Sequence, residues 1–372
     1  MSGKRILLIV DHCGPGEALR VSPLLGAVRA DHPSARITLL VSENAYPLFA
    51  GDGRFDRVVA SDLYRRTSRR ARRLRTLAGA ARLAARLGFG YDLVIVFLWG
   101  TTALNALARV VGRRRAIAYR HHLGALLANG PAEYGTDGDI AAGLALLAEA
   151  GIRFRPHDTP ALTVADRDRT YARDLMDTHG RRPGRPLVVM HPGSDWACQQ
   201  WLHERWAQLA DGIARQHDAD LAFTGVAAEH EFIEKIRARI GSPSMSLAGQ
   251  TTLPQLAAVI AQADLCVSVD SAAHDIAQAL RVPAVVLAGP TAPDAPAGRA
   301  LRVVNATPVP HRATILSCQA RFPAGFCFDY SCPFAGLRRI SVERVEQAIE
   351  ASGWAQERQA GGFVLTGRAV AD

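Results

Sequence analysis

The chain has 372 residues, of which 48% are hydrophobic and 21% charged, so it is long enough for two domains with separate cores and has the composition of a folded globular protein. Its net charge is +9, supplied almost entirely by arginine, and no signature of a nucleic-acid-binding module accompanies that charge. No apolar run reaches the ~20 residues that a membrane-spanning helix needs, and the first apolar run is too short for a secretory signal, so we expect a cytoplasmic protein.

Strands and helices alternate through the first half of the chain. Near-continuous apolar runs predict buried strands at 4–10, 35–41, 57–60, 92–97 and 115–119. Helical patterns fill segments between and after them, notably at 62–87, 101–111 and 141–150. This alternation predicts a mostly parallel sheet that is covered by helices on both faces.

A glycine-rich turn follows the first strand and contains Gly14, Gly16 and Glu17. The turn resembles a dinucleotide-binding fingerprint but lacks its third glycine, because Leu19 stands there. Glu17 has two interpretations. It is either a surface acid favoured by the helix dipole, or a base that faces a cleft between two domains.

The strand pattern stops and restarts between residues 152 and 186, where proline, arginine and aspartate become more frequent. We therefore predict a first domain at 1–165, a linker at 166–185 with one helical piece, and a second domain at 186–350. The remaining residues, 351–372, are predicted to form a tail that could return to the first domain.

Four predicted strands in the second half each run into a polar or glycine-rich turn. The strands are 186–190, 221–223, 265–269 and 284–288, and the turns that follow are His191 to Ser194, Thr224-Gly225, Asp270-Ser271 and Gly289-Pro290-Thr291. Helices are predicted at 204–216, 227–240, 253–263 and 341–350. Because the carboxyl ends of parallel strands share one edge of a sheet, where such sheets bind ligands, the four turns together predict a binding site.

The turn at Asp270-Ser271 leads into a helical pattern, so these residues occupy the position of an N-cap. One interpretation is a cap and nothing more; the other is that the helix N-terminus binds an anionic group. His274, in the first turn of that helix, is either a satisfied interior histidine or part of the same site.

Two further features leave alternatives open. The six cysteines are expected to be free thiols, although Cys318, Cys327 and Cys332 are close enough in sequence to form a bridge or hold a metal. The arginine-rich run from Arg65 to Arg75 is either the solvated face of a helix or a patch that contacts an anionic acceptor or a membrane surface.

Two doubly wound domains with these turns resemble the GT-B architecture, and the residues are similar to glycosyltransferase family 9, the ADP-heptose-type heptosyltransferases. The resemblance covers most of the chain. It is carried by Ile6 to Val10, Gly16 to Leu19, Pro23 to Leu25, Ala35 to Val41, His191 to Ser194, Trp201 to Trp206, Phe223 to Gly225, Leu247 to Gly249 with Leu253, Asp270 to His274, and Gly289 to Thr291.

The resemblance implies two Rossmann-like domains facing a central cleft, with an ADP-linked sugar bound by the second. The donor-binding residues it implies are His191, Gly193, Ser194, Gln199, Thr224, Gly225, Glu229, Asp270, Ser271, Ala272, His274, Gly289, Pro290 and Thr291. Glu17 would be the catalytic base of an inverting transfer, with Gly14 and Gly16 on the acceptor side. The resemblance implies neither a metal nor another cofactor.

Three positions depart from the family pattern. Glu17 stands for an aspartate, Ala272 for a glycine, and Gln199 for a lysine expected to face the donor phosphates. An amide can hydrogen-bond a phosphate but does not offset its charge.

Three functions therefore compete. The first is transfer of a heptose-type sugar from an ADP-sugar to a hydroxyl of a lipopolysaccharide core or another glycan or natural product. The second is epimerisation of a nucleotide sugar, as in UDP-N-acetylglucosamine 2-epimerases, and the third is nucleotide-sugar binding without catalysis.

Overall fold

A computed structural model describes residues 3–11, 13–61, 63, 69–98, 102–119, 139–154, 162–194, 199–288, 301–305 and 336–355. The chain divides into two compact units, Met1–Ala165 and Asp166–Asp372, which we describe separately.

The first unit contains a five-stranded sheet in which every pair of neighbouring strands is parallel. Its strands are β1 (Arg5–Val10), β2 (Arg36–Ser42), β3 (Arg57–Ser61), β4 (Tyr91–Val96) and β5 (Gly112–Ile117), in the order β3-β2-β1-β4-β5. The central strand β1 is inaccessible from Ile6 to Val10. Five consecutive apolar residues suit this position because both faces of the strand are covered.

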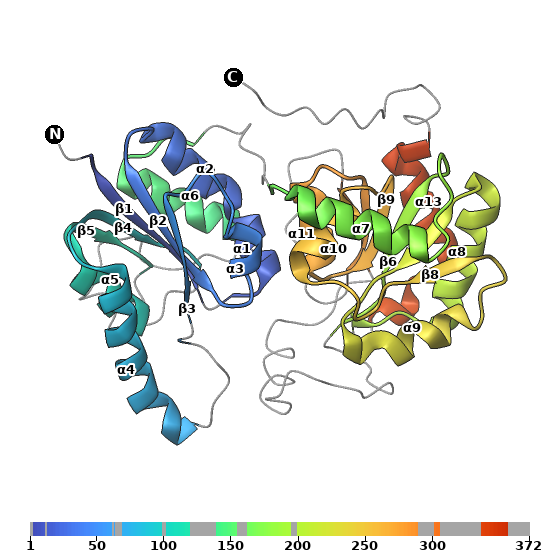
Figure 1. The fold of residues 1–372 in the computed structure, drawn as a ribbon, viewed down its shortest axis with the longest axis horizontal. Coiled ribbons are helices and arrows are strands. Elements are labelled where there is room, and N and C mark those ends of the chain that lie inside the picture. Colours follow the sequence, from blue (N-terminus) through green and yellow to red (C-terminus); the bar gives the residue numbers. More distant parts are fainter. Residues whose placement is uncertain are drawn as a thin grey trace. The chain divides into compact units, whose positions relative to one another are not determined.

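Helices cover both faces of this sheet (Figure 1). They are α1 (Pro15–Arg20), α2 (Ser22–Asp31), α3 (Tyr46–Phe49), α4 (Arg69–Leu87), α5 (Thr102–Val111) and α6 (Asp139–Ala150). On one face Leu7 and Ile9 belong to a core cluster with Leu83 of α4 and Leu104 of α5. Helices α2 and α6 contact each other on the other face.

The second unit contains a six-stranded sheet, again parallel throughout. Its strands are β6 (Leu187–His191), β7 (Asp220–Phe223), β8 (Ser244–Ser246), β9 (Leu265–Val269), β10 (Ala284–Ala288) and β11 (Leu301–Asn305), in the order β11-β10-β9-β6-β7-β8. Strands β6, β7, β9 and β10 are buried along their whole length.

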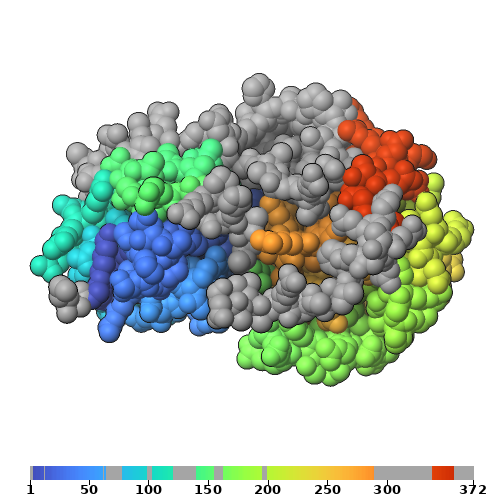
Figure 2. Space-filling view, turned by 90° about the horizontal axis from the view of Figure 1, so that it is seen from above, coloured from blue at the N-terminus to red at the C-terminus, as the bar shows by residue number. Residues whose placement is uncertain are grey.

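The helical segments of this unit are α7 (Asp166–Thr178), α8 (His203–His217), η3 (Ala227–Glu229), α9 (His230–Arg237), α10 (Leu253–Ile260), α11 (Ala272–Ala279), η4 (Gly336–Arg339) and α13 (Val342–Ser352). A core cluster joins Met190 of β6 to Trp206 of α8, Ile233 of α9 and Val345 of α13. Helix α10 contacts α7 and α11. The segment that carries α10 and α11, drawn in orange, reaches the surface of this unit in Figure 2.

Each sheet has one place where the direction of strand addition reverses. In the first sheet it lies between β1 and β4, and in the second between β6 and β9. The connections at such a place leave in opposite directions, which opens a crevice at the carboxyl ends of the strands. Glu17 follows β1, whereas His191 ends β6 and Asp270 follows β9.

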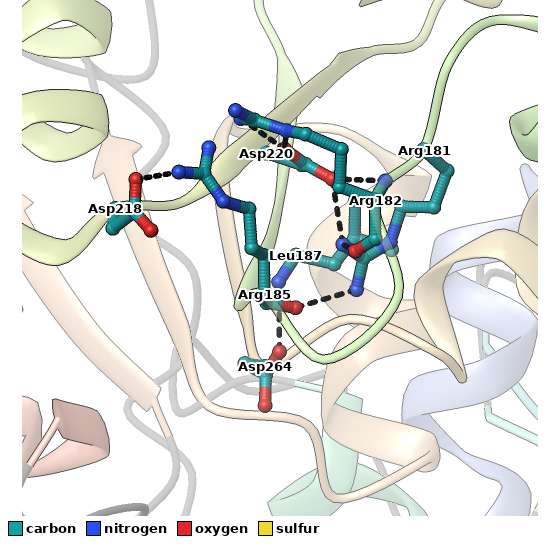
Figure 3. A network of polar contacts seen from close by, with 7 residues as sticks. All are labelled: Arg181, Arg182, Arg185, Leu187, Asp218, Asp220 and Asp264. Atoms are coloured by element: carbon teal, nitrogen blue, oxygen red, sulfur yellow. Dashed lines mark hydrogen bonds and ion pairs between the residues drawn. The ribbon is translucent and has the colours of Figure 1, made fainter.

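The opposite, amino-terminal edge of the second sheet is held by a network of ion pairs (Figure 3). Buried Asp220, at the start of β7, accepts hydrogen bonds from Arg181 and Arg182. Asp264 accepts the backbone N–H of Leu187 at 2.8 Å. The ion pairs therefore join the segment before β6 to the starts of the neighbouring strands.

The predicted fold class, two parallel α/β domains, is confirmed. Strands β8 and β11 and the short helix α3 were not predicted. Helix α7 lies in the stretch predicted as a linker but belongs to the second unit, where Tyr171 Oη donates to Gln250 O at 2.7 Å. In the described part of the chain no helix combines the length and hydrophobicity required to cross a membrane.

Candidate functional site

His191 and Thr224 meet at the carboxyl edge of the second sheet. His191 is the last residue of β6, Thr224 follows β7, and their Nδ1 and Oγ1 atoms are 2.9 Å apart. Both residues are buried. Burial, with a smaller effect from neighbouring His274, lowers the pKa of His191 to about 4. His191 is therefore a neutral, fixed residue at neutral pH.

This buried histidine makes the stability of the protein depend on pH. An unfolded histidine has a pKa of ~6.5, so between that value and about 4 the unfolded chain binds the proton and the folded chain does not. We expect the free energy of unfolding to fall by roughly 3 kcal/mol as the pH falls through this window. Urea unfolding of wild type and His191→Gln at several pH values measures the effect. Parallel pH profiles of the two proteins would contradict it.

Glu229 lies against two glycines of the same edge. Ideal Cβ atoms at Gly193 and Gly225 would come within 2.2 and 2.7 Å of its carboxylate oxygens. The carboxylate also accepts the backbone N–H of Val226 at 2.8 Å. The turns after β6 and β7 thus leave room for this carboxylate only because residues 193 and 225 have no side chain.

The third part of the edge is the N-terminus of α11. Ser271 is the N-cap, and its backbone N–H donates to His274 Nδ1 at 3.2 Å. Among the described residues, Ser271 Oγ has no hydrogen-bond partner. Ala272 is the first helical residue. The N-terminus therefore carries an available hydroxyl at a place where the helix dipole favours negative charge.

Two carboxylates accompany His274, whose side chain is 1% exposed. Asp270 Oδ1 is 3.9 Å from its Nδ1, and Asp275 Oδ1 is 3.2 Å from its Nε2. Asp275 is buried and was not among the predicted site residues. Its position in the first turn of a helix predicted to start at this edge was the available signal.

The turn after β6 is closed by side-chain contacts. Ser194 Oγ donates to Gln199 Oε1 at 2.8 Å, and Gln200 Nε2 donates to Ser194 O at 3.1 Å. Gln199, which stands where the family pattern has lysine, is thus used to hold the turn. The predicted residues Gly289, Pro290 and Thr291, and the cysteines at 198, 318, 327 and 332, lie outside the described residues.

In the first unit, Glu17 lies in the first turn of α1, for which Gly14 is the N-cap and Gly16 is buried. Its carboxylate bends back over Gly14, where an added Cβ would lie 2.7 Å from Oε2. Arg20 Nη2 is 3.9 Å from Oε1, and the Glu17 side chain remains 44% exposed. An accessible carboxylate that is fixed beside a switch point can take a proton from a bound substrate.

Sequence reasoning missed a second carboxylate of this unit. Asp11 directly follows β1, is buried, and accepts a hydrogen bond of 2.5 Å from Ser61 Oγ at the end of β3. Ser42 Oγ, at the end of β2, donates to Cys13 O at 3.0 Å. These bonds tie the turn that leads to Glu17 to the ends of two neighbouring strands.

A search for metal-binding groups found no set of three or more His, Cys, Asp or Glu side chains suited to hold an ion within the residues that the structure describes.

Comparison with known proteins identifies relatives. The model of glycosyltransferase family 9 (heptosyltransferase) matches residues 80–337. The lipopolysaccharide heptosyltransferase 1 of Pseudomonas aeruginosa is 34% identical over 127 residues, which are 33% of this chain and 34% of that protein. The alignments with the first curated relatives thus span about a third of their length.

Solved structures share the fold across nearly the whole chain. A glycosyltransferase family 9 protein from Veillonella parvula has a TM-score of 0.79 at 19% identity, covering 96% of this chain and 98% of its own. The Escherichia coli heptosyltransferase WaaC, solved with ADP-2-deoxy-2-fluoro heptose, has a TM-score of 0.65 at 18% identity, covering 93% and 99%.

Proposed function

Because the chain belongs to glycosyltransferase family 9, we propose that it transfers a heptose-type sugar from an ADP-sugar to a hydroxyl acceptor, with inversion at the anomeric carbon. One observation carries the proposal: candidate site residues follow the strands at the switch points of both sheets. An accessible carboxylate lies at the first and a helix N-terminus at the second.

In this proposal the second unit binds the donor. Adenine lies near Thr224 and Gly225, and the Glu229 carboxylate accepts hydrogen bonds from ribose hydroxyls. The diphosphate lies over Asp270, Ser271 and the N-terminus of α11, where backbone N–H groups and the helix dipole stabilise negative charge. A relative in this family was solved with an ADP-heptose analogue, which supports the choice of nucleotide.

The first unit supplies the base and binds the acceptor. Glu17 removes the proton of the acceptor hydroxyl as its oxygen bonds to the anomeric carbon of the donor sugar. The bond from that carbon to the diphosphate breaks, and its electron pair leaves with ADP. We propose that stabilisation of the departing ADP comes from oriented protein groups and that no cofactor takes part.

The acceptor is a sugar hydroxyl of a lipopolysaccharide core or another glycan or natural product. We further propose that the arginines of 65–75, at the start of α4, bring the protein to an anionic acceptor or a membrane surface. Replacing Arg69, Arg70, Arg72 and Arg73 by glutamine should then weaken binding to anionic vesicles severalfold. Unchanged vesicle binding and acceptor kinetics would count against this role.

The assay for the activity measures release of ADP from ADP-heptose with and without candidate glycan acceptors. Release that depends on the acceptor, with an inverted product linkage, supports the proposal. Conversion of the donor without an acceptor would indicate an epimerase, and binding without turnover would indicate a silent module.

The glycine at 193 provides a test of the ribose site. In Gly193→Ala the new methyl collides with the Glu229 carboxylate, because the ideal Cβ lies 2.1 Å from its Cδ. We expect ADP to bind about 10- to 100-fold more weakly, the loss of one or more hydrogen bonds to a charged group. Gly241→Ala is the matched control, since its nearest neighbour is 3.7 Å away. Equal ADP affinity of the two variants in calorimetry would show that Glu229 does not bind ribose.

A further inference from the structure

The proposed diphosphate position has an unusual charge balance. Asp270 and Asp275 both lie beside His274, and their side chains are 15% and 3% exposed. Gln199, the residue in place of the family lysine, is neutral and hydrogen-bonded to Ser194. An anionic donor therefore approaches two carboxylates without the cation that the family pattern would supply, which costs free energy unless positive charge appears on binding.

His274 is the group that can supply this charge. It is buried, its Nδ1 accepts the N–H of Ser271, and its Nε2 faces Asp275. These contacts assign the neutral tautomer with the proton on Nε2. A second proton on Nδ1 would place an imidazolium between the two carboxylates and beside the helix N-terminus.

Other groups around His274 do not compete for that proton. The titratable groups that the structure places against it are His191 from β6, Asp270 after β9 and Asp275 on α11 itself. His191 stays neutral above about pH 4. Helix α10, which contacts α11, has the sequence Leu-Pro-Gln-Leu-Ala-Ala-Val-Ile and contributes no charge.

We propose that binding of the donor diphosphate is coupled to uptake of one proton by His274, and that Asp275 is the positioning residue that stabilises the resulting imidazolium. The proton comes from solvent and adds to Nδ1, which releases the Ser271 N–H to donate to a phosphate oxygen. His274 thereby supplies the positive charge that Gln199 does not. The inference rests on the proposed function, because it assumes that this edge binds a diphosphate.

Calorimetric titration with ADP-glucose tests the coupling. This probe is chosen because both of its phosphates are esterified, whereas the terminal phosphate of ADP itself titrates near neutral pH. Measurement in two buffers with different ionisation enthalpies gives the number of protons taken up. Wild type should take up close to one proton at about pH 8, and its affinity should fall up to tenfold per pH unit above the pKa of the bound state.

Two variants separate the coupling from a structural role. Asp275→Asn keeps the shape of the side chain but removes its charge, so proton uptake should shift to lower pH by about one unit or more. His274→Gln should bind ADP-glucose with an affinity that does not change between about pH 6 and about pH 8.5. Asp177→Asn, on the exposed face of α7, is the control and should behave as wild type.

Binding of ADP-glucose without proton uptake across this pH range would overturn the inference and leave the proposed function intact. Uptake that persists unchanged in folded His274→Gln would also overturn it. Failure of wild type to bind ADP, ADP-glucose or ADP-heptose would instead overturn the proposed function, and the inference with it.

Discussion

Replacement of Glu17 by glutamine should lower the rate of sugar transfer by about 10²- to 10⁴-fold, the usual contribution of a general base. Glutamine keeps the size of the side chain but cannot accept the hydroxyl proton. ADP affinity should not change, because the donor residues all belong to the second unit. Steady-state kinetics combined with calorimetry separates the two effects.

Two companion variants test position as well as chemistry. Glu17→Asp keeps the carboxylate but withdraws it by one methylene, and Gly14→Ala pushes it aside, since the added Cβ would lie 2.7 Å from Oε2. Both should retain measurable activity, reduced by up to about 10²-fold, as expected for a misplaced catalytic group. Wild-type turnover in Glu17→Gln would show that another group is the base.

Asp220→Ala should be the most destabilising single substitution that we predict, with a loss of about 3 kcal/mol. Asp220 is buried and accepts from Arg181 Nη1, Arg182 Nε and the Arg182 backbone N–H, each at 2.7 Å (Figure 3). Removing it leaves these donors without their acceptor and frees the segment before β6. Because the Arg182 side chain is 43% exposed, water compensates in part, which favours the lower end of the range for buried pairs.

The pKa of Asp220 gives the same prediction an independent check. Burial raises this pKa, but the hydrogen bonds from Arg182 and Arg181 and the charge of Arg182 outweigh burial and lower it overall. The stabilisation is therefore complete above the ordinary aspartate pKa of ~3.9 and is lost as the pH falls through the lower folded-state value.

Asp218→Ala is the matched control for the ion-pair network. Asp218 pairs with Arg185 in the same network, but its side chain is 70% exposed. We expect a loss of less than about 1 kcal/mol, as for other surface ion pairs. Equal losses for the two variants in urea unfolding would contradict the central position given to Asp220.

The sequence predicted the buried strands well because their signal is local. Strands β9 and β10 have the predicted bounds, and β1 and β6 differ by one residue, because continuous apolar runs have few other uses in a parallel α/β protein. Strand β8 has only three residues, Ser-Met-Ser, and β11 is an edge strand whose five residues include Arg302 and Asn305. Neither pattern differs from that of a loop.

The candidate site was predictable where a residue follows a strand directly. Turns at carboxyl ends of strands identify His191, Thr224 and Asp270 without knowledge of side-chain positions. The placement of the Glu229 carboxylate against Gly193 depends on two turns 30 or more residues apart, so no local pattern contains it. The same holds for the bond between Asp11 and Ser61, which joins strands separated by β2.

Calorimetric titration of the protein with ADP, UDP and GDP tests the central claim most directly, with Glu229→Ala measured beside wild type. The proposed donor site predicts that ADP binds in preference to UDP and GDP, and that Glu229→Ala weakens ADP binding by at least about tenfold. Preference for another nucleotide, or no nucleotide binding by the folded wild-type protein, would contradict the assignment of an ADP-sugar donor to the second unit.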